Sequence, residues 1–317
     1  MKIYELNDHD DISHMMSNVP KAVAAIGFFD GVHLGHQALI KRAVDYAKEH
    51  DVESAVVTFY PHPSVVLNPD NKDIQYITPT QEKEKLIEQM GIDRLYIISF
   101  TRSLARLSPE EFINRFMIGL NIKHLIAGFD FSFGYKGAAN MKNIHQYVHD
   151  RFTYETVGKI ELADEKVSST RIRSLLAKGD VEAVETLLNR PFVTTGTVIH
   201  GFQRGGSELG YPTANIELDS EALLPKTGVY GVKIRYDEAI YYGMASLGFN
   251  PTFKDNPFDL KFEVHIFNFN GDLYGKTLDV EWKTYIRDEY KFDNVETLMA
   301  QLEKDEQTVR SYFNLNK

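Results

Sequence analysis

The sequence predicts an α/β domain, a parallel sheet with helices on both faces, followed by a small antiparallel β-barrel with a C-terminal helix. Between residues 22 and 177, apolar strand-like runs alternate with helical stretches, which is typical of a parallel sheet wrapped by helices. After residue 190 the runs become short and alternating, with many Tyr and Phe residues and regularly spaced turns, which favours a barrel. A chain of 317 residues is long enough for both domains.

The first part of the chain is expected to form strands at Ala22–Phe29, Ser54–Phe59, Arg94–Ser99, His124–Gly128 and Thr153–Val157. Helices are expected at Leu34–Glu49, Pro79–Met90, Pro109–Gly119, Asn140–His149 and Ser169–Ala177. Two of these helices begin at capping patterns, Thr78-Pro79-Thr80-Gln81 and Ser108-Pro109-Glu110-Glu111. Because ligands of parallel sheets bind at the carboxyl ends of the strands, we expect a site where the motifs below follow those strands.

The second part is expected to form strands at Val193–Ile199, Gly228–Arg235, Ala239–Ser246, Lys261–Phe269 and Thr277–Trp282. Asn270-Gly271, between the last two strands, predicts a hairpin turn. A final helix is expected at Val295–Phe313.

Charge and composition exclude several classes of protein. The net charge of −10 argues against a general nucleic-acid partner, because no basic stripe is available to neutralise phosphates. The absence of cysteine excludes disulfides, thiolate catalysis and cysteine metal sites. The polar N-terminus, MKIYELNDHDDI, is unlike a signal peptide, and no apolar run predicts a membrane span. We therefore expect a cytoplasmic protein without membrane or nucleic-acid partners.

The central motif is Gly27-Phe28-Phe29-Asp30-Gly31-Val32-His33-Leu34-Gly35-His36, between a predicted strand and a predicted helix. A turn of this kind directs backbone N–H groups and the positive end of the helix at a bound phosphate. The two imidazoles could stabilise charge that builds up during phosphate transfer. Solvated or helix-capping histidines are an equal alternative, and metal ligation is disfavoured because no third His or Cys ligand lies nearby.

Three further motifs follow later strands. Thr58-Phe59-Tyr60-Pro61-His62-Pro63 predicts an extended loop held by its prolines, or a plain strand exit. The rings in Gly128-Phe129-Asp130-Phe131-Ser132-Phe133-Gly134 predict either an apolar slot for a flat ring or ordinary core. Val167-Ser168-Ser169-Thr170-Arg171-Ile172-Arg173 opens a helix with hydroxyls and guanidiniums, which suits a phosphate or an exposed capped helix.

Two segments of the second part carry candidate chemistry. The glycine-rich stretch from residue 201 to 210 could wrap ATP phosphates, and Thr213 and Asn215 after it could coordinate Mg²⁺, although a long hairpin loop is the simpler alternative. In Phe262-Glu263-Val264-His265-Ile266, alternation places Glu263 and His265 on the opposite face from the apolar residues. Glu263 is either a solvated carboxylate or a base that accepts the proton of a bound alcohol.

Taken in order, GFFDGVHLGHQ, TFYPHPS, GFDFSFG and VSSTRIR resemble the N-terminal module of prokaryotic bifunctional riboflavin kinase/FAD synthetases, a Rossmann-like nucleotidyltransferase domain. The PTAN, GVYGV, GFNPTF, FEVHIF and RDEYKF segments are similar to the flavokinase module of that family. The junction near LNRPF implies domains at residues 1–188 and 189–317. Asn189, where the family has Gly, and Ser207, where it has a basic residue, depart from the pattern.

The resemblance implies two ATP-dependent steps: phosphorylation of riboflavin to FMN in the second domain, and adenylylation of FMN to FAD in the first. It implies His33, His36 and Glu263 as catalytic residues. For ATP and phosphate in the first domain it implies Gly27, Phe28, Asp30, Gly31, Gly35, Ser169, Thr170 and Arg173. For flavin in the first domain it implies Phe59, His62, Pro63, Asp130 and Phe131.

For the kinase domain the resemblance implies ATP contacts at Gly201, Arg204, Gly205, Gly206, Gly210 and Pro212, and flavin contacts at Asn250 and Arg287. Thr213 and Asn215 would hold Mg²⁺ or another hard divalent cation. ATP, riboflavin and FMN are the expected substrates, and the protein is expected to be a monomer or a weak homo-oligomer. An adenylyltransferase with an impaired kinase half, motivated by Ser207, and a non-catalytic flavin-binding regulator remain as alternatives.

Overall fold

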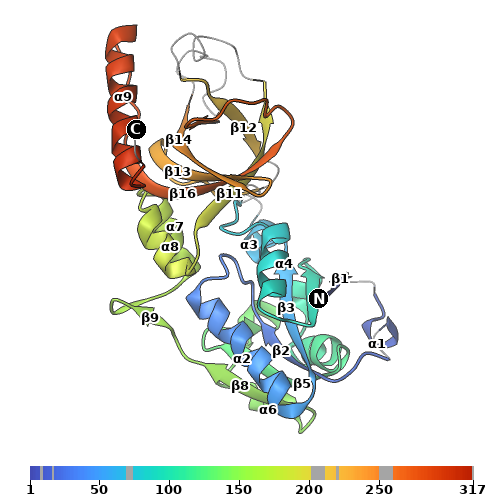
Figure 1. Cartoon of the computed structure of the whole chain (residues 1–317). Coiled ribbons are helices and arrows are strands. Elements are labelled where there is room, and N and C mark those ends of the chain that lie inside the picture. The colour runs from blue at the N-terminus through green and yellow to red at the C-terminus, as the bar shows by residue number, and fades with distance from the viewer. Residues whose placement is uncertain are drawn as a thin grey trace. The chain divides into compact units, whose positions relative to one another are not determined.

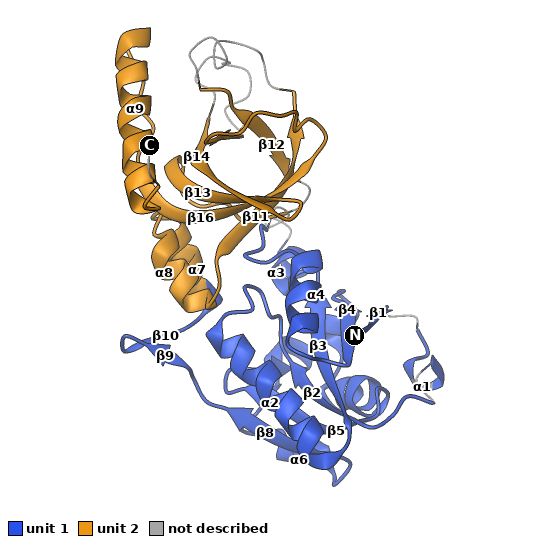
Figure 2. Cartoon of the chain, viewed as in Figure 1, with its two compact units in different colours: residues 1–169 blue, residues 170–317 orange. Residues whose placement is uncertain are grey.

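The computed structural model describes residues 1–7, 10–15, 18–68, 74–200, 211–218, 221–249 and 260–315. The chain forms two compact units, Met1–Ser169 and Thr170–Lys317 (Figure 2).

The first unit contains a six-stranded sheet in the order β1-β4-β3-β2-β5-β8, and all of its pairings are parallel. Its strands are β1 Lys2–Leu6, β2 Ala22–Ile26, β3 Glu53–Tyr60, β4 Arg94–Ser99, β5 Ile122–Gly128 and β8 Thr153–Val157. The predicted parallel sheet and its expected strands are confirmed. The edge strand β1 was not predicted, because its exposed and partly exposed residues carry no continuous apolar run.

Helices cover both faces of this sheet, as predicted. The helical segments are α1 Ile12–Met15, α2 Leu34–His50, α3 Pro63–Leu67, α4 Thr80–Gln89, η1 Leu104–Arg106, α5 Pro109–Phe112, the π-helix Ile113–Ile118, η3 Tyr135–Gly137 and α6 His145–Val148. Along β2, Val23 and Ala25 pack in one cluster with α2 and α4, whereas Ala24 and Ile26 pack in another with α5, the π-helix and α6. Two short ladders pair β6 Ser132–Phe133 with β7 Ala139–Asn140 and β9 Glu161–Leu162 with β10 Glu165–Lys166.

The expected helix over residues 140–149 is mostly wrong, since only its last turn is helical. The Asn143 side chain accepts a hydrogen bond from the Asn140 N–H, and the Asn140 side chain accepts one from the Lys142 N–H. Such local bonds compete with helical ones. The Ser108 capping box is confirmed, but Thr78 does not cap α4: the N-cap is Pro79, without a side-chain bond.

The second unit is a closed antiparallel barrel in the order β11-β12-β15-β14-β13-β16, with α9 along its outside (Figure 1). Its elements are α7 Ser169–Leu176, whose first residue ends the first unit, α8 Val181–Leu188, β11 Phe192–Ile199, β12 Ala214–Leu218, β13 Gly228–Tyr236, β14 Ala239–Phe249, β15 Leu260–Ile266, β16 Thr277–Arg287 and α9 Val295–Tyr312. The predicted barrel and terminal helix are confirmed, whereas α8 and β12 were not predicted.

The predicted hairpin at Asn270-Gly271 is wrong. Strand β15 pairs with β12 and β14, whereas β16 pairs with β11 and β13, so the two strands are not neighbours. The connection between them is held at each end by a different strand. The Phe267 N–H donates to the Tyr242 carbonyl of β14 at 2.8 Å, and the Gly275 N–H donates to the Val198 carbonyl of β11 at 2.9 Å.

The barrel interior is built around Trp282, which is fully buried and donates from Nε1 to Thr194 Oγ1 at 2.8 Å. The rings of Tyr230 and Phe262 lie 4.9 and 5.1 Å from it, centroid to centroid. These aromatic pairs pack the interior of the barrel with side chains around Trp282.

Helix α9 is joined to β16 by a buried ion pair. The Arg287 guanidinium contacts Asp305 Oδ2 at 2.8 Å from Nε and 2.7 Å from the terminal nitrogen, and Asp305 is 1% exposed.

Asn189 ends α8 with φ 54°, a left-handed conformation that glycine and asparagine adopt most readily. This conformation explains why either residue can stand at the junction.

Replacing Asp305 by Ala is expected to destabilise the barrel unit by about 3 kcal/mol, because the Arg287 charge would lose its buried partner. Denaturant unfolding followed by the fluorescence of Trp282, the only tryptophan in the chain, measures this unit alone. The exposed residue Glu303 on the same helix provides the matched control, Glu303→Ala, with an expected change within about 0.5 kcal/mol. Equal effects of the two variants would contradict the prediction.

Candidate active sites

The turn between β2 and α2 has a backbone that its residues disfavour. Phe29 has φ 53° and Val32 has φ 39°, both in the left-handed region, and Gly31 between them has φ 94°. Each such non-glycine residue costs on the order of 1–3 kcal/mol, and it persists only where the surroundings determine it. Strain of this kind concentrates at functional sites, which marks this turn as a candidate.

Neighbouring elements hold the turn in place. Thr58 Oγ1 on β3 donates to the Phe28 carbonyl at 3.0 Å, and the Thr78 N–H donates to Asp30 Oδ1 at 3.2 Å. Ser169 Oγ, at the start of α7, donates to the Asp30 carbonyl at 2.8 Å. The buried Asp30 therefore fixes the turn rather than facing solvent.

The two histidines stack on each other at the start of α2. His33 caps the helix by accepting the His36 N–H on Nδ1 at 3.3 Å, and the ring centroids lie 3.7 Å apart at 16°. This confirms the capping alternative for His33. A Cβ at Gly35 would lie 3.2 Å from His33 Cε1, so any larger residue there would press on the ring.

His36 differs from His33 in its hydrogen bonding. Its Nδ1 is enclosed and has no hydrogen-bond partner among the residues that the structure describes. Burial, followed by the electrostatic effects of His33, Lys83 and Lys166, holds the pKa of His36 well below its usual range. The ring is therefore neutral at pH 7, and its Nδ1 is buried without a hydrogen-bond partner among the described residues.

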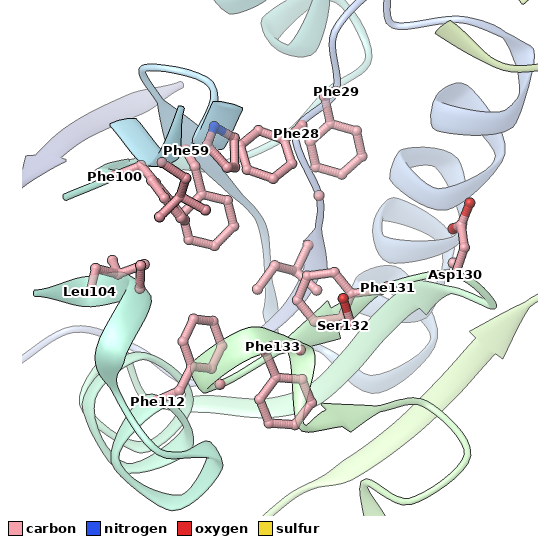
Figure 3. Close-up of a pocket in the computed structure, with 18 of the residues that line it drawn as sticks. Phe28, Phe29, Phe59, Phe100, Leu104, Phe112, Asp130, Phe131, Ser132 and Phe133 are labelled. Carbon is pink, nitrogen blue, oxygen red and sulfur yellow. The ribbon is translucent and has the colours of Figure 1, made fainter. Parts of the chain in front are cut away.

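A cavity of about 590 Å³ opens beside this turn at the carboxyl ends of β2, β3, β4 and β5 (Figure 3). Aromatic rings dominate its lining, and His36 and Gly27 also contribute. The rings are Phe28, Phe29, Phe59, Phe100, Phe112, Phe131 and Phe133. An apolar cavity of this size with a few polar groups at its edge is typical of a small-molecule site.

Four of the residues expected to contact flavin in the first domain line this cavity, namely Phe59, Pro63, Asp130 and Phe131. His62 does not line it: its ring lies 5.1 Å from that of Phe28, and its Nδ1 caps α3 through the Ser64 N–H. The extended loop expected there is wrong from Pro63 onward, because Pro63 begins helix α3.

Several lining residues were not predicted, among them Phe100 and Phe112. Phe100 follows directly after β4, so the rule that ligands bind at strand ends could have identified it. Phe112 lies on α5 and gives no comparable signal.

Thr170 and Arg173, two of the expected phosphate contacts, lie on the first turns of α7 in the second unit, where Thr170 is exposed and Arg173 is half-buried.

In the barrel, Glu263 lies between Asn215 and Ser246, its partners across β12 and β14. The predicted alternation of β15 is confirmed: Glu263 and His265 are half-buried, whereas the intervening apolar residues are buried. His265 donates from Nδ1 to the Pro212 carbonyl at 2.8 Å, which fixes the segment that precedes β12. Thr213 in that segment is exposed.

Arg287 forms an ion pair with Asp305, and its Cζ lies 4.7 Å from the ring centroid of Tyr290. A second carboxylate, Glu289, was not predicted: burial raises its pKa against the opposing effects of Arg287 and of a hydrogen bond with Ser246, and the negative charge of Glu263 adds a smaller rise. The expected contacts at Gly201, Arg204, Gly205, Gly206, Gly210 and Asn250, and the departure at Ser207, lie outside the described residues.

The barrel places two possible oxygen ligands on neighbouring strands. Asn215 and Glu263 are paired across two strands, and amide and carboxylate oxygens suit a hard cation. Among the residues that the structure describes, there is no group of three or more His, Cys, Asp or Glu residues arranged to hold a metal. Mg²⁺ with few protein ligands, completed by water and substrate phosphates, fits such a donor set.

The sequence matches two family models, FAD synthetase over residues 15–171 and riboflavin kinase over residues 188–313. It is 45% identical over 291 residues to a protein of Listeria monocytogenes, covering 92% of each chain, and 42% identical over 299 residues to one of Bacillus subtilis, covering 94% of each. Both relatives are named bifunctional riboflavin kinase/FMN adenylyltransferase.

A solved structure from Streptococcus pneumoniae, described as a macrolide-efflux protein, superposes with a TM-score of 0.89 at 34% identity over 98% of this chain and 99% of that one. Within the described part of this chain, no helix has the length and apolar character needed to cross a membrane.

We expect His36 to stay neutral when the pH is lowered through 6.5, because burial of its ring, followed by the electrostatic effects of His33, Lys83 and Lys166, holds its pKa down. NMR titration of the imidazole resonances measures this directly, and His36→Gln identifies the signal by its loss. A titration midpoint at or above 6.5 for that signal would contradict the prediction.

Proposed function

Because the chain belongs to the family of bifunctional riboflavin kinase/FMN adenylyltransferases, we propose that the first unit holds the adenylyltransferase site and the barrel holds the kinase site. The family matches end at residue 171 and begin at residue 188, which supports a functional boundary between residues 188 and 189. The compact units divide earlier, after Ser169, and either division leaves the barrel complete.

The proposed location of the adenylyltransferase site rests on the aromatic cavity beside the strained turn of His33 and His36. The cavity accepts the flat flavin ring, and the turn faces the phosphates. The FMN phosphate oxygen attacks the α-phosphorus of ATP, the bond to the bridging oxygen breaks, and pyrophosphate leaves. No covalent enzyme intermediate is needed, so the protein acts by alignment and by stabilising charge.

In this proposal, neutral His36 donates a hydrogen bond to the phosphate oxygens as negative charge develops on them. His33 fixes the orientation of His36 by stacking on it and capping the helix. Gly27, Gly31 and Gly35 let the phosphates approach the backbone, and Ser169, Thr170 and Arg173 are the further phosphate contacts that the sequence favours.

For the kinase, we propose that Glu263 accepts the proton of the ribityl hydroxyl as its oxygen attacks the γ-phosphorus of ATP, which releases ADP. Mg²⁺ held by Thr213 and Asn215 would neutralise phosphate charge. The pairing of Asn215 with Glu263 across β12 and β15 supports this, because the proposed base and the proposed metal ligand are neighbours on adjacent strands. The glycine-rich residues 201–210, Asn250 and Arg287 complete the proposed substrate contacts.

We also propose that the enzyme is cytoplasmic and acts as a monomer or weak homo-oligomer. The sequence without cysteine supports the former. Riboflavin, FMN and ATP are its proposed substrates. Conversion of riboflavin to FMN and then to FAD in one reaction with ATP and Mg²⁺ would test these three substrates together.

Two substitutions should separate the activities. We expect His36→Ala to abolish FAD formation from FMN while FMN formation from riboflavin stays within about twofold, because the imidazole serves only adenylyl transfer. Glu263→Gln should do the reverse, because it removes the base but retains the shape of the side chain. Chromatographic product analysis of both reactions gives the measurement.

His14→Ala, at an exposed histidine of α1, is the matched control and should change neither activity. Loss of both activities in either active-site variant would contradict the division into two sites.

A further inference from the structure

Lys83 on α4 is a buried amine that the mechanism above leaves unused. It is 3% exposed, whereas lysine is almost never buried without a partner. Its Nζ lies 3.4 Å from the Phe28 carbonyl, in the turn after β2, and 3.5 Å from Thr58 Oγ1 on β3. The nearby charge of Asp30 favours the ammonium form.

The carbonyl that Lys83 approaches is the one whose direction matters for the turn. Rotation about the N–Cα bond of Phe29, with φ 53°, sets the orientation of the peptide between Phe28 and Phe29. Because the carbonyl and N–H of a trans peptide point in opposite directions, fixing the Phe28 oxygen also fixes the Phe29 N–H. Thr58 and Lys83 both hold that oxygen, and so oppose relaxation of Phe29 to an ordinary conformation.

We propose that Lys83 is a positioning residue of the adenylyltransferase site: its ammonium holds the Phe28 carbonyl and thereby the turn that presents His33 and His36 to the phosphates. This inference rests on the proposed location of adenylyl transfer in the first unit. It assigns Lys83 a role in alignment, without contact to substrate.

Charge provides a second link between Lys83 and the histidines. Burial lowers the pKa of Lys83 to about 8, against the opposing effects of Asp30 and Glu84. The ammonium in turn helps to hold the pKa of His36 low, together with His33 and Lys166. As the pH rises through about 8, Lys83 loses its proton and its charge-assisted hold on the Phe28 carbonyl weakens. Adenylyl transfer should therefore decline above this pH.

The test compares Lys83→Met, which removes the charge, with Lys83→Arg, which keeps it, and with Lys85→Met as the matched control at an exposed position of the same helix. We expect Lys83→Met to lower kcat/KM for FAD formation about 100-fold, as small misplacements of aligned groups do. FMN formation by the same molecules should stay within about twofold. Lys85→Met should leave both reactions unchanged.

The ratio of adenylyl transfer to kinase rate across pH 7 to 9.5 separates positioning from a merely structural role. In the unsubstituted protein this ratio should fall above about pH 8, and in Lys83→Arg the fall should disappear because arginine stays charged. A flat ratio in the unsubstituted protein, or a fall that persists in Lys83→Arg, overturns the proposal even if Lys83→Met does not fold. So does FAD formation within twofold of normal in Lys83→Met.

Failure of the underlying assignment gives a different result. If His36→Ala leaves adenylyl transfer intact, the reaction is not located at this turn, whatever the Lys83 variants do. If His36→Ala abolishes it and the Lys83 variants behave normally, only the role of Lys83 is wrong.

Discussion

The first unit depends on keeping one turn in a backbone conformation that its residues disfavour. Thr58 on β3, Thr78 in the loop before α4 and Ser169 at the start of α7 all bond the turn in which Phe29 and Val32 are in the left-handed region. The parallel sheet makes this possible, since the carboxyl ends of β2, β3, β4 and β5 lie side by side and place their loops around one cavity. The site is thus a property of sheet topology more than of any single motif.

The elements that sequence patterns predicted well are those with strong local signals. The buried run at Arg94–Ser99 and the long amphipathic pattern from Leu34 matched the structure almost residue for residue. Local signals failed where a distant partner decided the outcome. Asn270-Gly271 has the composition of a hairpin turn, but closure of the barrel places β15 and β16 apart, and no local pattern encodes that choice.

The sequence predicted the motifs of the candidate site but not the residues around them that hold or influence those motifs. Glycines, histidines and aromatic residues after strands can be recognised by type and spacing, and the structure brings several of them around one cavity. Lys83 could not be recognised, because a lysine in a charged helical stretch is normally solvated, and only the fold shows that this one is buried. Glu289 likewise acquires its relation to Glu263 only through the packing of the barrel.

Closure of the barrel joins the first strand of the second unit to its last, since β11 pairs with β16 from Phe192 with Trp282 to Thr197 with Thr277. Every strand of the parallel sheet, by contrast, is complete at Val157. A ribosome adds about 5–20 residues per second, so for some seconds the nascent chain has a complete sheet and an open barrel. The barrel is therefore completed last during translation, because one edge of β11 has no partner until β16 emerges.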